Sequence, residues 1–155
     1  MTLSRWQPYQ QKRLAEERQL LRSTMPGFDI RQPLGDTHVA GEWVSNAGYL
    51  YEVRIYLPRG YPDECPSTYV VSPSPLLDHR GKPVVKWGDS HMGHTWKSDR
   101  RGWVKLCTFR PANWDASNSL VQIARKSLLW IVAYEQHVRQ GTQIDDLLQT
   151  MRERT

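Results

Sequence analysis

Two cysteines, Cys65 and Cys107, carry the most reactive side chains of this 155-residue chain. Cys107 lies between a short apolar run and a loop over residues 108–114, and catalytic groups collect on loops at the ends of rigid elements. Lys105 and Arg110 are close in sequence and favour the thiolate, the form of cysteine that attacks. The alternative is a small buried side chain, because free cysteine is among the most buried residue types. Cys107 is therefore the candidate nucleophile.

Cys65 is the weaker candidate of the two cysteines. Asp63 and Glu64 precede it, and carboxylates close to a thiol raise its pKa rather than lower it. A Cys65–Cys107 disulfide is not expected in a reducing compartment. We predict that Cys65 is structural and dispensable for chemistry.

His91 and His94 form a His-x-x-His pair upstream of Cys107. With Cys107 they offer donor atoms for zinc, but Gly93 disfavours a helix that presents both, and no Cys-x-x-Cys accompanies them. We predict no metal site. Either histidine then serves as a partner that orients or polarises the nucleophile. No Gly-rich phosphate loop occurs, so no nucleotide cofactor is expected either.

The elements that must position these residues begin with a helix. Residues 6–23 are polar with sparse leucines and predict a surface helix that ends before Pro26. Alternation of apolar and polar residues then predicts four strands, starting at Phe28 and covering residues 38–45, 49–57 and 67–72. Residues 73–105 contain repeated Gly and Pro breaks, which predict a long irregular loop, and residues 102–107 form a short extended piece.

A helical period returns from residue 117. Ser119 with Gln122 makes a capping box, Ser117 is an equal candidate for the N-cap, and Gly141 is a C-terminal stop. A final short helix follows at residues 144–151, with Asp145 in its first turn. The order predicts one α+β domain over residues 1–155: an N-terminal helix, a four-stranded antiparallel meander, a long irregular active-site loop and C-terminal helices.

Composition and charge narrow the classes of partner. The net charge is +5, and seven Trp are scattered along the chain without a nucleic-acid recognition motif, so no nucleic-acid partner is expected. No apolar run approaches the ~20 residues that span a bilayer, and the N-terminus has no signal core. We expect a cytoplasmic protein with no membrane partner.

Several short motifs follow one another along the chain. They are a meander ending in Tyr56-Leu57-Pro58, then Gly60-Tyr61-Pro62, Cys65-Pro66, a His-bearing loop, Lys105-Leu106-Cys107, Trp114 and a long helix. In this order of motifs, over about residues 10 to 140, the chain resembles ubiquitin-conjugating enzymes, and the stretch Leu129–Glu135 with Gly141 resembles the bacterial branch of that family.

The resemblance implies a ubiquitin-conjugating-enzyme fold in which Cys107 accepts a C-terminal acyl group as a thioester and an amine then attacks it. A hydrogen-bond donor must stabilise the tetrahedral intermediate. The family's eukaryotic members use a His-Pro-Asn segment, for which His94 is the nearest match, with His91 close behind. Asn113, Thr95 or backbone N–H groups are the alternatives.

The resemblance also implies partners. Bacterial proteins of this type resemble components of anti-phage CBASS operons, where the conjugated protein is a cGAS-like nucleotidyltransferase, joined through its C-terminus, or a ubiquitin-like protein. A further alternative is a non-catalytic binding module of the same fold.

Overall fold

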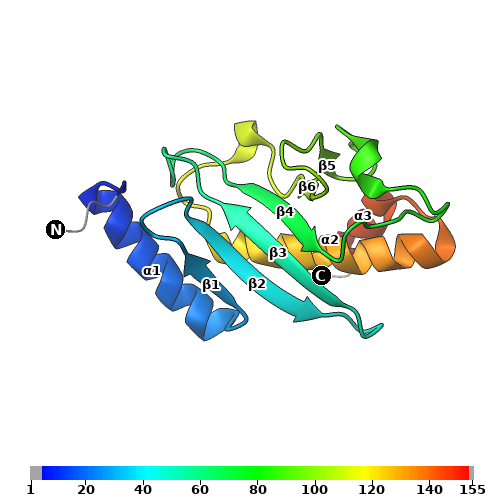
Figure 1. Ribbon diagram of the computed structural model, residues 1–155, viewed down its shortest axis with the longest axis horizontal. Coiled ribbons are helices and arrows are strands. Elements are labelled where there is room, and N and C mark those ends of the chain that lie inside the picture. The colour runs from blue at the N-terminus through cyan, green and yellow to red at the C-terminus, as the bar shows by residue number, and fades with distance from the viewer. Residues whose placement is uncertain (1–4, 154–155) are drawn as a thin grey trace.

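The computed structural model describes residues 5–153 and has an α+β architecture (Figure 1). Helix α1 (Pro8–Thr24) is followed by β1 (Phe28–Arg31), β2 (His38–Val44), β3 (Leu50–Tyr56) and β4 (Ser67–Ser72). Next come the 3-10 helix η1 (Val84–Trp87), β5 (Thr95–Trp96), β6 (Val104–Leu106) and the 3-10 helix η2 (Pro111–Asn113). Helices α2 (Leu120–Gln140) and α3 (Ile144–Glu153) complete the described chain. The α+β class with an N-terminal helix, an antiparallel sheet and C-terminal helices is confirmed.

The described strands form one antiparallel sheet in the order β1-β2-β3-β4-β6-β5. Its first four strands are the predicted meander. The predicted number of four strands is wrong, because β6 adds to the edge of β4 and β5 adds to β6, which makes six within residues 5–153. Strand β6 falls within the predicted extended piece, whereas β5 lies in the segment predicted to be irregular. Strands of two and three residues are too short to show an alternating pattern.

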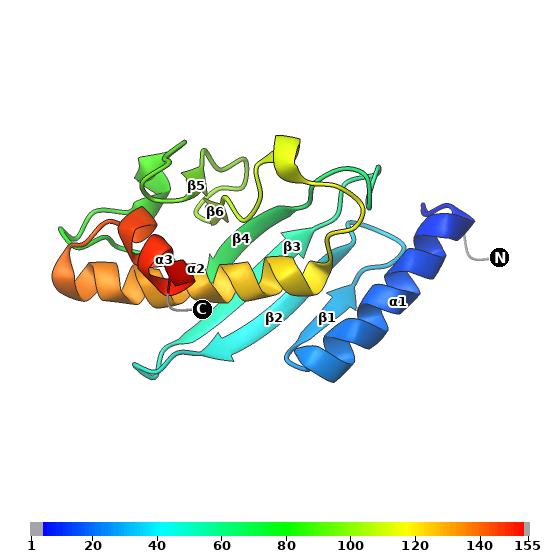
Figure 2. The same cartoon turned by 180° about the vertical axis from the view of Figure 1, so that it is seen from behind.

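Strand β3 shows why the meander forms. Tyr51, Val53 and Ile55 are buried on one face, while Glu52 and Arg54 between them are half-buried on the other. This period of two is the pattern of a strand with one face on the core. Helix α2 runs across that face of the sheet, as Figure 2 shows, and contributes Ile123 and Ile131 to the same hydrophobic cluster.

Both ends of α2 lie where the sequence places them. Ser119 is the N-cap: its side chain accepts from the Gln122 N–H, and the Gln122 side chain accepts from the Ser119 N–H in return. Ser117 is therefore not the cap. Gly141 ends the helix with a positive φ of 77°, a left-handed conformation that glycine adopts without steric cost.

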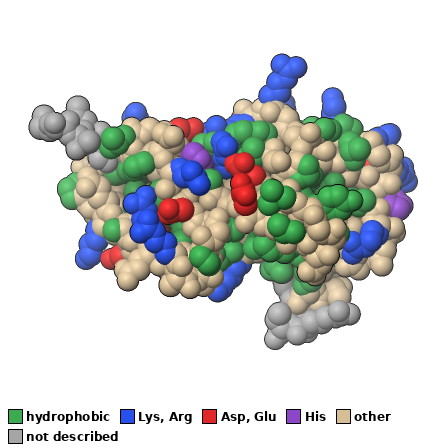
Figure 3. Space-filling model, turned by 60° about the horizontal axis from the view of Figure 1, so that its bottom comes forward, with side chains coloured by type: hydrophobic (Ala, Val, Ile, Leu, Met, Phe, Trp, Pro, Cys, Tyr) green, Lys and Arg blue, Asp and Glu red, His purple; other side chains and the backbone are tan. Residues whose placement is uncertain are grey.

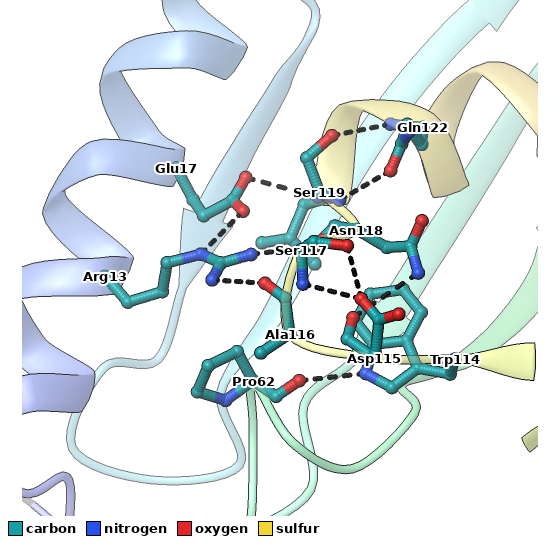
Figure 4. Close-up of polar contacts among 11 residues, drawn as sticks. Arg13, Glu17, Pro62, Trp114, Asp115, Ala116, Ser117, Asn118, Ser119 and Gln122 are labelled. Carbon is teal, nitrogen blue, oxygen red and sulfur yellow. Dashed lines mark hydrogen bonds and ion pairs between the residues drawn. The ribbon is translucent and has the colours of Figure 1, made fainter.

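The start of α2 is also tied to α1 by a buried carboxylate (Figure 4). Glu17 is only 3% exposed and accepts hydrogen bonds from the Arg13 Nε, at 3.0 Å, and from the backbone N–H of Leu120, at 3.1 Å. Arg13 also donates to the carbonyl oxygens of Ala116 and Asn118, at 2.6 and 2.7 Å. The Arg13–Glu17 pair thus provides hydrogen-bond partners for the first N–H of α2 and for two carbonyl oxygens of the loop before it.

Helix α3 folds back alongside α2 near β5 and β6 (Figure 2), and the backbone N–H of Asp145 donates to the carbonyl oxygen of Met92, at 2.8 Å. Among the described helices, none is both long and apolar enough to cross a membrane.

Removal of the Glu17 carboxylate should destabilise the protein strongly. Glu17→Ala leaves the Arg13 guanidinium without its counter-charge and the Leu120 N–H without its acceptor, and we expect the free energy of unfolding to fall by about 3 kcal/mol. Glu17→Gln keeps an acceptor and should lose about half of that. The measurement is an equilibrium unfolding curve in urea, with tryptophan fluorescence as the signal.

The matched control is Glu16→Ala, which removes an exposed carboxylate from the adjacent position of α1. Its stability should stay within about 0.5 kcal/mol of wild type. Equal losses in the two alanine variants would show that the buried contact to α2 contributes nothing specific.

Candidate active site

Cys107 directly follows β6, the strand that pairs with β4 on one side and β5 on the other. Thr95 and Leu106 are register partners, so the antiparallel pairing places His94 opposite Cys107. The Cys107 N–H donates to the His94 carbonyl oxygen, at 2.9 Å. The backbone at the cysteine is therefore held by two neighbouring strands and by the histidine segment.

The half-buried Cys107 lines two hollows, and His94 lines both of them as well. One hollow, of about 190 Å³, has mainly apolar walls from α2 and α3: Leu129, Trp130, Leu148 and Met151. The other, of about 350 Å³, has several polar and charged side chains among its lining residues Asp89, Ser90, His91, Thr95, Trp96 and Arg110. The structure thus brings together Cys107 and His94, two of the residues that the sequence singled out.

Burial and nearby cations act on the Cys107 thiol in opposite directions. Burial raises its pKa above the ordinary value for cysteine, while the charges of Arg110 and Lys126 pull the pKa down. The sequence indicated Arg110 for this role but also Lys105, which instead lies 3.7 Å from the Asp99 carboxylate. Lys126 comes from α2, 19 positions along the chain from Cys107, and no local pattern could have indicated it.

Cys65 is a half-buried free thiol whose pKa is raised to about 11, mainly by burial and next by the neighbouring Cys107. Its Sγ lies 3.4 Å from the carbonyl oxygen of Pro66 and donates to it. The expected rise in the pKa of Cys65 is confirmed, but its cause is different. Burial is the largest cause, rather than the charges of the preceding Asp63 and Glu64. A protonated thiol of this kind is a poor nucleophile.

The His94 ring is fixed by a carboxylate that the sequence search missed. Its Nε2 donates to Asp145 Oδ1, at 2.6 Å, and this bond is the main cause that lowers the pKa of Asp145. The Trp130 indole N–H donates to the Gly93 carbonyl oxygen, at 2.8 Å, and holds the segment just before the histidine. From sequence, Asp145 was visible only as an acid in the first turn of the last helix.

The other residues considered as hydrogen-bond donors to the tetrahedral intermediate have different surroundings from His94. Asn113 is exposed on η2 and lines neither hollow, and the Thr95 hydroxyl donates to the Gly88 carbonyl oxygen, at 2.8 Å. The His91 side chain is 62% exposed, with its Nε2 3.8 Å from Asp145 Oδ2 and its Nδ1 3.2 Å from Arg110 Nη2. His94 is thus the better buried of the two histidines.

Within residues 5–153, no three His, Cys, Asp or Glu side chains are grouped so as to hold a metal ion. On the face shown in Figure 3, Lys and Arg side chains are spread among acidic and hydrophobic ones. That face offers no continuous basic stripe of the kind that follows a nucleic-acid backbone.

Comparisons with models of known protein families, with curated proteins and with solved structures find no match to this chain.

Alkylation by iodoacetamide should report the state of the Cys107 thiol in a Cys65→Ser background. Because only the thiolate reacts and the raised pKa keeps it scarce, the rate should increase about tenfold per pH unit between about pH 7 and 9. Arg110→Ala removes a cation that lowers this pKa, so the rate at fixed pH should fall about threefold. Mass spectrometry of the intact protein measures the rate.

Arg101→Ala is the control, since it removes the same charge at an exposed position that lines neither hollow. A rate that depends on Arg101 as much as on Arg110 would mean that only net charge matters.

Proposed function

We propose that the chain is a ubiquitin-conjugating-enzyme-like acyltransferase. Cys107 carries the C-terminal acyl group of another protein as a thioester and passes it to an amine. The observation that carries this proposal is the place of Cys107, at the end of a strand paired on both sides and lining two different hollows. One hollow accommodates the end of the acyl chain, and the other admits the attacking amine.

The chemistry needs two steps at the same sulfur. In loading, the Cys107 thiolate attacks the activated C-terminal carbonyl carbon, the S–C bond forms, the activating group leaves and the thiol proton passes to solvent. In discharge, an amine nitrogen attacks the thioester carbon, the N–C bond forms and the C–S bond breaks. The amine loses one proton, and Cys107 returns to a thiol.

Negative charge develops on the carbonyl oxygen in both steps. The cations that act on the thiol, Arg110 and Lys126, also lie where they would stabilise that charge. Their effect is strengthened because Cys107 is half-buried, where charges are screened less than in water. We therefore assign the electrostatic role to them, rather than to Asn113, which is exposed outside both hollows.

The order of elements supports a ubiquitin-conjugating-enzyme fold. An N-terminal helix, a four-strand meander, a cysteine after a further short strand and a long C-terminal helix follow one another as in that family. The added strands β5 and β6 place the cysteine at the end of a strand that is paired on both sides. We propose this fold with the two extra strands as a feature of this chain.

The partner we propose is a separate bacterial protein whose C-terminus reaches Cys107. A cGAS-like nucleotidyltransferase of an anti-phage CBASS operon is the first choice, and a ubiquitin-like protein is the second, both in the bacterial cytoplasm. A cavity of about 190 Å³ beside the sulfur suits a small residue at the end of the acyl chain.

Loading can be tested without the natural partner. The probe is a short peptide that ends in Gly and carries a 2-mercaptoethanesulfonate thioester at its C-terminus. We expect the intact mass to show one peptide adduct that dithiothreitol removes, and this adduct should be retained in Cys65→Ser and lost in Cys107→Ala.

Cys107→Ser should give either no adduct or one that dithiothreitol does not remove, because an ester replaces the thioester. A wild-type protein that forms no adduct, or whose adduct persists in Cys107→Ala, would contradict the proposal and favour a non-catalytic binding module.

The partner is tested by affinity purification from the native host, with Cys107→Ala as bait and Cys65→Ser as the control. Recovery of a nucleotidyltransferase or a ubiquitin-like protein supports the proposal. Recovery of nucleic acid with neither protein class would contradict it.

A further inference from the structure

A carboxylate and an imidazole form a hydrogen-bonded pair beside Cys107, and this pair suggests a role in the amine-transfer step. Asp145 Oδ1 accepts from His94 Nε2 at 2.6 Å, with the two side chains 10% and 16% exposed. We propose that His94 carries the proton in the amine-transfer step and that Asp145 is the positioning residue that fixes its ring. This inference rests on the proposed function.

Asp145 is held firmly enough to fix another side chain. Its Oδ2 accepts from Gln149 Nε2, at 2.8 Å, one turn along α3, and its own N–H donates to the Met92 carbonyl oxygen, at 2.8 Å. The last helix is thus fastened to the segment that carries His94. Both carboxylate oxygens are engaged, so the carboxylate has one orientation toward the ring.

His94 itself has a backbone conformation that most side chains avoid. Its φ is +52°, in the left-handed region, and such strain in a non-glycine residue persists only where the surroundings impose it. Here the hydrogen bonds from Cys107 to the His94 carbonyl oxygen and from Trp130 to the Gly93 carbonyl oxygen impose it. The strained residue lies on the wall of both hollows.

The engaged Nε2 determines which ring nitrogen is left for chemistry. A carboxylate that accepts from Nε2–H selects that tautomer and leaves Nδ1 as the basic atom. Among residues 5–153, none makes a hydrogen bond to His94 Nδ1. Nδ1 is therefore the atom that can take a proton from a substrate.

The proposed step balances at each atom. As the amine nitrogen bonds to the thioester carbon, one amine proton moves to His94 Nδ1, and Asp145 stabilises the resulting imidazolium. The C–S bond breaks, and the Cys107 thiolate then takes the proton from His94, directly or through water. The products are the amide and the free thiol, with His94 neutral again.

Two charged or titratable neighbours share this end of the site. His91 Nε2 lies 3.8 Å from Asp145 Oδ2, and Arg110 contacts the His91 ring. His91 is exposed and lies near Asp145 Oδ2, the oxygen that does not bond to His94. We therefore expect His91 to affect the charge around the pair but not to replace His94. Variants of His91 should therefore retain most of the discharge rate.

The experiment separates discharge from loading. Protein loaded with the Gly-ending peptide thioester is mixed with lysine amide, and loss of the adduct is followed by intact mass. We expect Asp145→Asn to slow discharge at least about tenfold and His94→Asn about a hundredfold, with the loading rates within about threefold of wild type. Asparagine at position 94 tolerates the left-handed conformation, so this variant is expected to fold.

The matched control is Asp146→Asn, which removes an exposed carboxylate from the next position of α3. Its discharge rate should equal that of wild type. Equal slowing in both asparagine variants would assign the effect to helix charge and overturn the proposal.

A purely structural role is distinguished by chemical rescue. His94→Gly fits the positive φ and leaves room for a small base. Added imidazole should then restore discharge at least about tenfold, and it should leave wild type unchanged. Slow discharge without rescue, or loading slowed as much as discharge, would overturn the role of His94 as proton carrier.

A second readout does not require loading. Long-range proton–nitrogen NMR should show His94 with Nε2 protonated in wild type, and a mixture of tautomers in Asp145→Asn, because an amide can donate as well as accept. An unchanged tautomer would overturn the role of Asp145. If the peptide never loads onto Cys107, the proposed function fails, whatever the NMR result.

Discussion

The buried carboxylate of Glu17 is the interaction on which the placement of the long helix α2 depends. A charge out of water needs partners, and Glu17 has two: the Arg13 guanidinium and the first free N–H of α2, at Leu120. The partial positive charge of that helix end adds to the attraction. Helix α1 and the loop before α2 are thereby joined at one point, which sets where α2 begins its path across the sheet.

Once its start is placed, α2 supports both segments that flank Cys107. The Trp130 indole donates to the Gly93 carbonyl oxygen on the histidine side, and Lys126 Nζ donates to the Thr108 carbonyl oxygen on the other, at 3.2 Å. Leu129 lies between these positions and lines the apolar hollow. The helix that covers the core is therefore also the element that shapes the site, so core packing and site geometry are coupled through α2.

Burial of the cysteine has two chemical consequences that oppose each other. It keeps the thiol protonated, which limits unwanted reactions, and it strengthens the action of Arg110 and Lys126 on any negative charge that forms there. In the proposed discharge step, the departing Cys107 thiolate takes up the proton that His94 carries, and its raised pKa favours that uptake.

The sequence by itself determined the long elements and the candidate nucleophile. The alternation in β3, the helical period of α2 and the caps Ser119 and Gly141 are local signals, because each arises from residues a few positions apart. The short strands β5 and β6 carry too few residues for a period to appear. The contact of His94 with Asp145 joins residues 51 positions apart, and only the folding of α3 back onto the histidine segment brings them together. Tertiary structure alone decided these features, since contacts between distant segments depend on how whole elements pack.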